Sequence, residues 1–136
     1  MSLSSQPPAP ARPRLLIVDD DPAVLDVTRS MARAFGCHSL LADSAQHGLE
    51  LFLEHSHSLD SVLVDLNMPG IGGLELIRRI RQHRPETHIL LMTADHVDEA
   101  CLKSAGIPAD CLLNKPFTLD QLKSALLGDE GLAEAA

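Results

Sequence analysis

Five short apolar segments alternate along the chain with longer segments whose apolar residues recur every three or four positions. The apolar segments are Leu15–Val18, Ser39–Ala42, Val62–Val64, Ile89–Met92 and Cys111–Leu113. Their apolarity is continuous rather than alternating, which is typical of strands covered on both faces in a parallel sheet. The segment Ser39–Ala42 is the least apolar and is predicted to lie at an edge of that sheet.

Each apolar segment is followed by a pattern typical of a helix. The residues predicted to begin or end these helices are Asp21 with Pro22, Gly36, Ser44, Gly72 with Gly73, and Thr118. A fourth helix is predicted over Val97 to Ala105. The side chains expected to face the sheet are Val24, Val27, Thr28, Met31, Phe35, Leu49, Phe52, Leu53, Leu74, Ile77, Ile80, Leu122, Ala125 and Leu126. Five strand-helix units with right-handed crossovers predict a three-layer α/β sandwich.

The composition fits one folded domain. The chain has 136 residues, of which 45% are hydrophobic, and this is enough apolar material for one core. Residues 1–13 are Ser, Pro and Ala with little to bury, and are predicted to be a disordered leader. Residues 14–127 are predicted to be the folded unit, and residues 128–136 an acidic, Ala-rich tail that frays.

The charge and the cysteines narrow the class of protein. Eleven Lys and Arg stand against 19 Asp and Glu, a net charge of −8, which argues against direct binding of nucleic acid or of an anionic membrane surface. The three cysteines have unrelated spacings and are interpreted as reduced thiols. Because the apolar runs are too short to cross a bilayer, a cytoplasmic location is expected.

Polar side chains gather where the predicted strands end. The segments that follow four of the strands are Asp19–Asp21, Asp65, Thr93–Asp95 and Asn114–Pro116. Ligands of open parallel sheets bind at the carboxyl ends of the strands, so a strand order of 2-1-3-4-5 would bring these groups to one edge. Oxygen ligands without thiolate or imidazole suit Mg²⁺. A lysine and a hydroxyl opposite the acids would suit a phosphoryl group, whose transfer needs mainly positioning and electrostatics.

Four motifs, in order, resemble those of the receiver domain of two-component response regulators. They are "LLIVDDDP", "VLVDLNMPGIGGLEL", "ILLMTAD" and "LLNKPFTLDQL", and together they cover Arg14 to Leu127. The resemblance implies a flavodoxin-like, CheY-like (βα)5 fold with a five-stranded parallel sheet of order 2-1-3-4-5. It also implies a phosphoacceptor switch that is not an enzyme beyond its own phosphorylation and dephosphorylation.

The resemblance assigns the acids to a phosphorylation and Mg²⁺ site. Asp65 would be the phosphoacceptor and would form an acyl phosphate. Asp20 and Asp65 would ligate Mg²⁺ through their side chains, Asn67 through its backbone carbonyl, and Asp19 mostly through water. Asp21 is interpreted as a helix cap rather than a ligand.

The resemblance also assigns the groups that would hold the phosphoryl oxygens. Thr93 would hydrogen-bond one oxygen with help from the Ala94 backbone N–H, and Lys115 would pair with the phosphate charge. Pro116 matches a family proline whose peptide bond is usually cis and would aim Lys115 inward. Asn67 and Asp95 match the positions where the family tunes the lifetime of the acyl phosphate.

The sequence departs from the family pattern near the last strand. Leu112 stands where the family usually has Tyr or Phe, so coupling at this switch position would have to come from packing rather than ring rotation. Gly106 precedes Lys115 by nine residues, a longer spacing than usual, which predicts an altered entry to the strand. Elsewhere, the glycines around Gly72 are interpreted as a turn, and the basic run Arg78, Arg79 and Arg81 as a solvated helix face.

The partners follow from the family. A sensor histidine kinase, a phosphotransfer protein or a small phosphodonor would supply the phosphoryl group. A downstream output domain or target protein would bind the face made by the fourth helix, the fifth strand and the fifth helix, roughly Asp95 to Leu127, and phosphorylation could also form a homodimer. Two alternatives stay open: a phosphate-independent interaction or dimerisation module, and a Mg²⁺-dependent phosphohydrolase.

Overall fold

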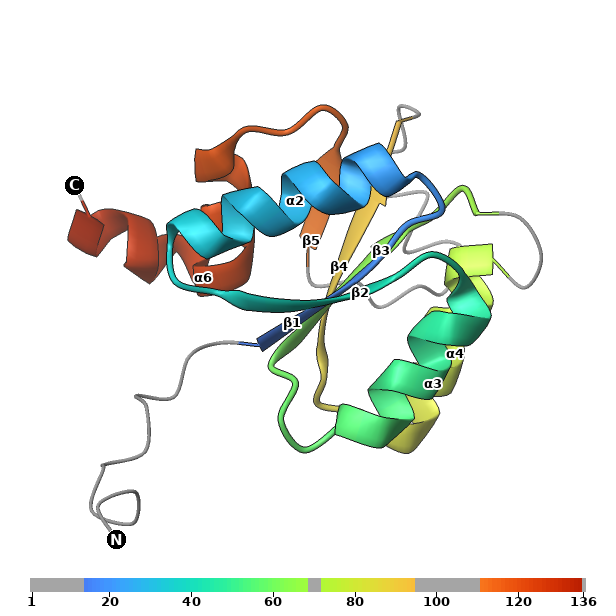
Figure 1. Ribbon diagram of the computed structural model, residues 1–136. Coiled ribbons are helices and arrows are strands. Elements are labelled where there is room, and N and C mark those ends of the chain that lie inside the picture. Colours follow the sequence, from blue (N-terminus) through green and yellow to red (C-terminus); the bar gives the residue numbers. More distant parts are fainter. Residues whose placement is uncertain (1–13, 69–71, 95–110, 136) are drawn as a thin grey trace, which may run out of the picture.

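A computed structural model of the protein describes residues 14–68, 72–94 and 111–135 (Figure 1). The strands in these residues are β1 (Arg14–Val18), β2 (His38–Ala42), β3 (Ser61–Asp65), β4 (His88–Thr93) and β5 (Cys111–Asn114). The helices are α2 (Pro22–Ala34), α3 (Ala45–His55), α4 (Gly72–His83) and α6 (Leu119–Ala135). The helix predicted over 97–105 and the predicted leader over 1–13 lie outside the described residues.

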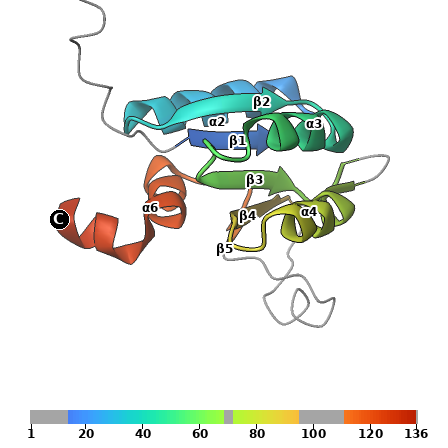
Figure 2. The same ribbon diagram turned by 90° about the horizontal axis from the view of Figure 1, so that it is seen from below.

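The strands form one parallel sheet in the order β2-β1-β3-β4-β5 (Figure 2). This order confirms the prediction, and it places β1 and β3 side by side at the point where the chain reverses its direction of winding. All five residues of β3 are buried, whereas β2 is half-buried over most of its length. The weaker apolarity of β2 therefore did indicate an edge strand.

Two apolar clusters, one on each face of the sheet, form the core. On one face, Leu15 and Ile17 of β1 pack with residues of α2 and α6; on the other, Leu16 and Val18 pack with residues of α3 and α4 (Figure 1). Alternate residues of a strand point to opposite faces, so a strand covered on both sides must be apolar throughout. The continuous apolar runs in the sequence have this cause.

The predicted helix starts are confirmed by their capping bonds. The Asp21 side chain accepts a hydrogen bond from the Ala23 N–H at 2.9 Å, and Ser44 Oγ accepts one from the His47 N–H at 3.0 Å. Thr118 Oγ1 likewise accepts from the Gln121 N–H, at 3.1 Å. Each side chain satisfies a backbone donor that the first helical turn leaves unpaired.

Most side chains predicted to face the sheet are buried or half-buried, but the prediction is wrong for one residue in each of α2, α3 and α4. Val27 is 54% exposed, Leu53 48% and Leu74 37%. Instead, Leu25 and Leu76 are buried against the sheet. With 3.6 residues per turn, an apolar stripe is about 100° wide, and several apolar residues around its margin cannot be ranked from spacing alone.

The last helix is longer than predicted. The backbone of α6 continues through Ala135, whereas residues 128–136 were expected to form a frayed tail. Ala, Leu and Glu between Gly128 and Ala135 are good helix formers, and this offsets the two glycines there. Among the helices in the described part of the chain, none combines the length and the apolarity needed to cross a membrane.

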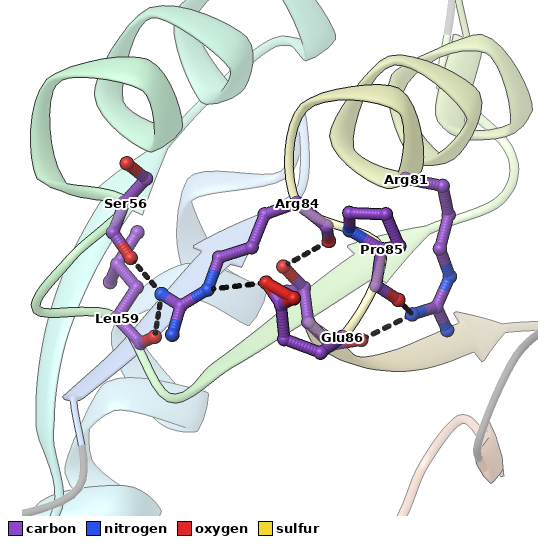
Figure 3. A network of polar contacts seen from close by, with 7 residues as sticks. Ser56, Leu59, Arg81, Arg84, Pro85 and Glu86 are labelled. Atoms are coloured by element: carbon purple, nitrogen blue, oxygen red, sulfur yellow. Dashed lines mark hydrogen bonds and ion pairs between the residues drawn. The ribbon is translucent and has the colours of Figure 1, made fainter.

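Two arginines donate hydrogen bonds to backbone carbonyls of the loops at the amino ends of the strands (Figure 3). Arg84, just after α4, donates from Nη1 to the backbone carbonyls of Ser56 and Leu59 in the connection between α3 and β3. Arg81 donates from Nη1 to the carbonyls of Pro85 and Thr87, which lead into β4. The Arg84 bonds therefore join the connection after α4 to the connection after α3, whereas the Arg81 bonds hold the α4–β4 connection to the end of its own helix.

Candidate acidic site at the carboxyl ends of the strands

Strand pairing brings two acids together at the carboxyl end of the sheet. Val18 is the register partner of Val64, so the residues that follow them, Asp19 and Asp65, emerge next to each other. Asp19 is fully buried and Asp65 is 4% exposed, whereas Asp20 is exposed. Each of these three residues offers a carboxylate oxygen, and the three oxygens lie within 4.8 Å of one another.

Lys115 reaches this acid cluster from the end of β5. Its backbone N–H donates to the Thr93 carbonyl at 2.8 Å, which extends the pairing of β5 with β4 past its last residue. Its Nζ lies 2.7 Å from Asp19 Oδ2 and 3.3 Å from Asp65 Oδ2. The Lys115–Pro116 peptide bond is cis.

Asn67 connects Asp65 to Thr93. The Asn67 backbone N–H donates to Asp65 Oδ1 at 3.1 Å, and its side-chain Nδ2 donates to Thr93 Oγ1 at 3.4 Å. Thr93 is fully buried at the end of β4. The family resemblance implies a role for the Asn67 backbone carbonyl and for acyl-phosphate lifetime, but not this side-chain contact with Thr93.

Burial and neighbouring charges act in opposite directions on these groups. Burial raises the pKa of Asp65 above its ordinary value and the charge of Asp19 adds to this, although the Asn67 N–H and Lys115 lower it in part. Burial alone would lower the pKa of Lys115, but the hydrogen bond and charge of Asp19, followed by Asp65, raise it overall. Lys115 therefore stays charged, and it compensates the acids only in part.

The donor set fits a hard divalent cation. All three clustered side chains are carboxylates, and like charges this close raise the free energy of the ionised site unless a cation is present. Both Asp19 oxygens are already engaged, Oδ1 by the Asp21 N–H at 2.9 Å and Oδ2 by Lys115. Asp20 is exposed to solvent instead. Oxygen-only donors with access to water are what Mg²⁺ prefers.

Two features of the site were not predicted from the sequence: a close approach of α4 to β3 and an apolar hollow. A Cβ added at Gly73 would overlap the backbone carbonyl oxygen of Asp65, so the first turn of α4 approaches β3 where only glycine fits. Beside Lys115 there is also an apolar hollow of about 470 Å³ between α2 and the segment that connects β5 to α6. Its lining residues are Ala23, Val24, Val27, Thr28, Met31, Ala94, Lys115, Pro116 and Phe117. Val27 was expected to face the sheet, so the sequence pattern did not indicate this hollow.

Four other positions were singled out in the sequence, and two of them, Ala94 and Leu112, lie within the described residues. Ala94 is exposed and lines the hollow beside Lys115. Leu112 is half-buried and packs against the core cluster on the α3 and α4 face of the sheet. Asp95 and the entry to β5 around Gly106 fall outside the described residues.

The sheet order and the carboxylates at its reversal point define a doubly wound α/β protein with an acidic, lysine-paired site. A family model described as "Response regulator receiver domain" matches residues 15–127. The chain belongs to the family of response regulator receiver domains, which function in two-component signalling.

Known proteins agree with this assignment. The chain is 35% identical to the virulence sensor protein BvgS of Bordetella pertussis, over 99% of this chain but 12% of that protein. It is 38% identical to the response regulator MprA of Mycolicibacterium vanbaalenii, over 90% of this chain and 55% of that protein. The chain therefore spans about half, or much less, of the length of these relatives.

Solved structures extend the likeness to three dimensions. The response regulator TrrA of Thermotoga maritima, in complex with Mg²⁺ and BeF, matches with a TM-score of 0.72 and 32% identity, over 82% of this chain and 94% of that one. A receiver domain protein of Clostridium thermocellum matches with a TM-score of 0.77 and 26% identity, over 90% of this chain and 96% of that one.

Proposed function

We propose that this domain is a phosphorylation-controlled switch in which Asp65 accepts a phosphoryl group. The observation that carries the proposal is the convergence of Asp65 with Asp19, Asp20 and Lys115 at one edge of the sheet. A carboxylate nucleophile, two further acids and a fixed cation form the set needed for phosphoryl transfer by positioning and electrostatics.

In the proposed reaction, a carboxylate oxygen of Asp65 attacks the phosphorus of the donor. The bond between phosphorus and the donor nitrogen or oxygen breaks, and the leaving group keeps the electron pair. Lys115, which is already 3.3 Å from Asp65 Oδ2, neutralises charge on the transferred group. Thr93 and the Ala94 N–H would contact phosphoryl oxygens.

The residues that would hold Mg²⁺ are Asp20 and Asp65 through their side chains and Asn67 through its backbone carbonyl. When bound, the ion offsets the repulsion among the carboxylates and polarises the phosphoryl oxygens. Asp19 would act mostly through water. Its two oxygens are engaged by Asp21 and Lys115, which supports this indirect role.

The phosphodonor is proposed to be a sensor histidine kinase, a phosphotransfer protein or a small acyl phosphate. A protein donor has to seat its phosphohistidine next to Asp65. The apolar hollow lined by Val27, Met31 and Phe117 adjoins Lys115 and provides apolar area for such docking. The docking side would then be α2 and the segment that connects β5 to α6.

The output is proposed to be altered binding of a target protein or an output domain through the face over residues 95–127. Part of this face, residues 95–110, lies outside the described residues. Leu112 packs against the core of the domain, and this supports coupling through packing. Pairing of two phosphorylated copies is a second form that this output could take.

The test is the intact mass of the protein after incubation with acetyl phosphate. We expect one phosphoryl group on the wild type with Mg²⁺, and none without Mg²⁺ or on Asp65→Asn. Asp60→Asn is the matched control, because Asp60 lies at the opposite end of the sheet and should leave the mass increase intact.

The same experiment separates the two alternatives. Steady release of phosphate from small phosphate esters, without a stable adduct, would indicate a phosphohydrolase. No adduct, together with unchanged amide NMR spectra on adding beryllofluoride and Mg²⁺, would indicate a phosphate-independent interaction module and would overturn the proposal.

A further inference from the structure

We propose that Asn67 is a positioning residue that orients the hydroxyl group of Thr93 as a hydrogen-bond donor. The inference rests on the proposed function, because the acceptor would be an oxygen of the phosphoryl group on Asp65. Asn67 is suited to this role since it touches both partners: its backbone N–H donates to Asp65 Oδ1, and its Nδ2 donates to Thr93 Oγ1.

A hydroxyl group has one proton, so the direction of that proton decides what the group can do. When Thr93 Oγ1 accepts a hydrogen bond from Asn67 Nδ2, its own proton must point elsewhere. Thr93 is then held as a donor for a phosphoryl oxygen, which has only lone pairs to offer. Without the amide, the proton of Thr93 could turn toward position 67.

The backbone of Thr93 is held in place at the end of β4. Its carbonyl accepts from the Lys115 N–H at 2.8 Å, and Thr93 is the register partner of Asn114 in β5. On the other side, the Leu66 N–H donates to the Met92 carbonyl at 2.9 Å. Since the β-branched side chain is stiff at χ1 and fully buried, its hydroxyl torsion is the main freedom left.

The backbone and the side chain of Asn67 can be tested separately. Any residue except proline at position 67 would supply the N–H to Asp65 and a backbone carbonyl for a metal ion, but only a side-chain donor can make the contact with Thr93. Asn67 is exposed, so a replacement of the same shape leaves the core unchanged. Asn67→Asp is that replacement, because it exchanges the amide donor for an acceptor.

A double-mutant cycle with beryllofluoride and Mg²⁺ tests the inference. The two changes are Asn67→Asp and Thr93→Val, which removes the hydroxyl at constant shape, and the measurement is the beryllofluoride dissociation constant from calorimetry. We expect Asn67→Asp to weaken binding by about tenfold more with Thr93 than in the Thr93→Val background. The added negative charge acts in both backgrounds and therefore cancels.

Rescue by Thr93→Ser distinguishes positioning from packing. Ser keeps the hydroxyl but lacks the methyl group, so the large effect of Asn67→Asp should return in that background. Equal effects of Asn67→Asp in all three backgrounds would overturn the inference. Tighter binding on Asn67→Asp would also overturn it, since Thr93 would then be donating to position 67 in the bound state.

Failure of the proposed function has a different signature. In that case the wild type gains no mass from acetyl phosphate and does not bind beryllofluoride, and both proposals are overturned. If only the inference fails, the mass increase and the binding persist, and the cycle is additive.

Discussion

The two ends of the sheet use charge in opposite ways. At the amino ends of the strands, Arg81 and Arg84 donate to neutral backbone carbonyls and fasten the neighbouring loops (Figure 3). At the carboxyl ends, three carboxylates lie close together, and Lys115 pairs with two of them, Asp19 and Asp65; no arginine in the described residues donates to these acids. The charges at the amino end therefore stabilise the fold. The carboxyl end retains negative charge that a bound cation would neutralise, and it is open to a phosphoryl group.

Because of this difference, effects on stability and effects on phosphorylation can be separated by mutation. A charged donor on a buried carbonyl contributes to folding without a ligand. A buried acid beside another acid lowers stability until something binds. Changes at the amino end should therefore alter unfolding alone, and changes at the carboxyl end should alter phosphorylation as well.

The largest effect is expected for Gly73→Ala at the carboxyl end. The new Cβ would overlap the Asp65 carbonyl oxygen, so the backbone at the end of β3 has to shift. Overpacking of this kind costs about 3 kcal/mol of unfolding free energy, and the displaced carboxylate should slow phosphorylation at least about tenfold. Urea unfolding and the rate of mass gain from acetyl phosphate measure the two effects.

Gly48→Ala is the matched control. Its Cβ would lie 2.9 Å from Val18 Cγ2, a side-chain atom that can shift, so a loss of about 1 kcal/mol is expected with phosphorylation unchanged. If both variants slowed phosphorylation equally, the close approach at Gly73 would have no special role in holding Asp65.

The sheet and the acidic cluster could be predicted from the sequence, because both follow from local patterns of apolar and acidic residues. Continuous apolarity marked β1 and β3 as buried, and the acids at their ends had to meet once the strand order was known. The Asn67 contact with Thr93 depends on side-chain directions 26 residues apart, which spacing does not determine. The close approach at Gly73 depends likewise on how α4 docks.

Arg81 is an instructive error of interpretation at the amino end. The run Arg78, Arg79 and Arg81 is predicted to be a solvated face, and Arg78 and Arg79 are indeed exposed and form ion pairs with Glu75 on the same helix. Arg81 instead turns toward the start of β4 and donates to two carbonyls. A charge run gives no sign that one member points inward to unpaired backbone groups.

The second prediction concerns Arg84→Ala at the amino end. The change leaves the carbonyls of Ser56 and Leu59 without their charged donor, and we expect a loss of about 2 kcal/mol in the free energy of unfolding. Phosphorylation by acetyl phosphate should keep the wild-type rate. The control is Arg29→Ala, which removes only an exposed ion pair with Asp26 and should cost at most about 0.5 kcal/mol. A slower phosphorylation rate in Arg84→Ala would show that the two ends are coupled.

The smallest expected effect is a pH dependence of stability due to the Cys37 thiol, a buried acid at the amino end of the sheet. It is compared with the carboxylic acids at the carboxyl end. Burial, followed by the charge of Asp60, raises the pKa of the Cys37 thiol from 9.0 to about 11. The folded protein thus holds this proton more tightly than the unfolded chain, so the stability it contributes is fully present below pH 9.0 and is lost as the pH rises toward about 11.

Between about pH 8 and pH 10, the wild type should lose roughly 1 kcal/mol more than Cys37→Ala, after allowance for solvent screening. Urea unfolding of both proteins across this range measures the difference. The chain has no tyrosine, and every titratable group other than Cys37 is common to both proteins, so their difference isolates this thiol. Parallel pH profiles would mean that the Cys37 thiol loses its proton as readily in the folded protein as in the unfolded chain. The contrast between a neutral buried acid at the amino end and charged ones at the carboxyl end would then not hold.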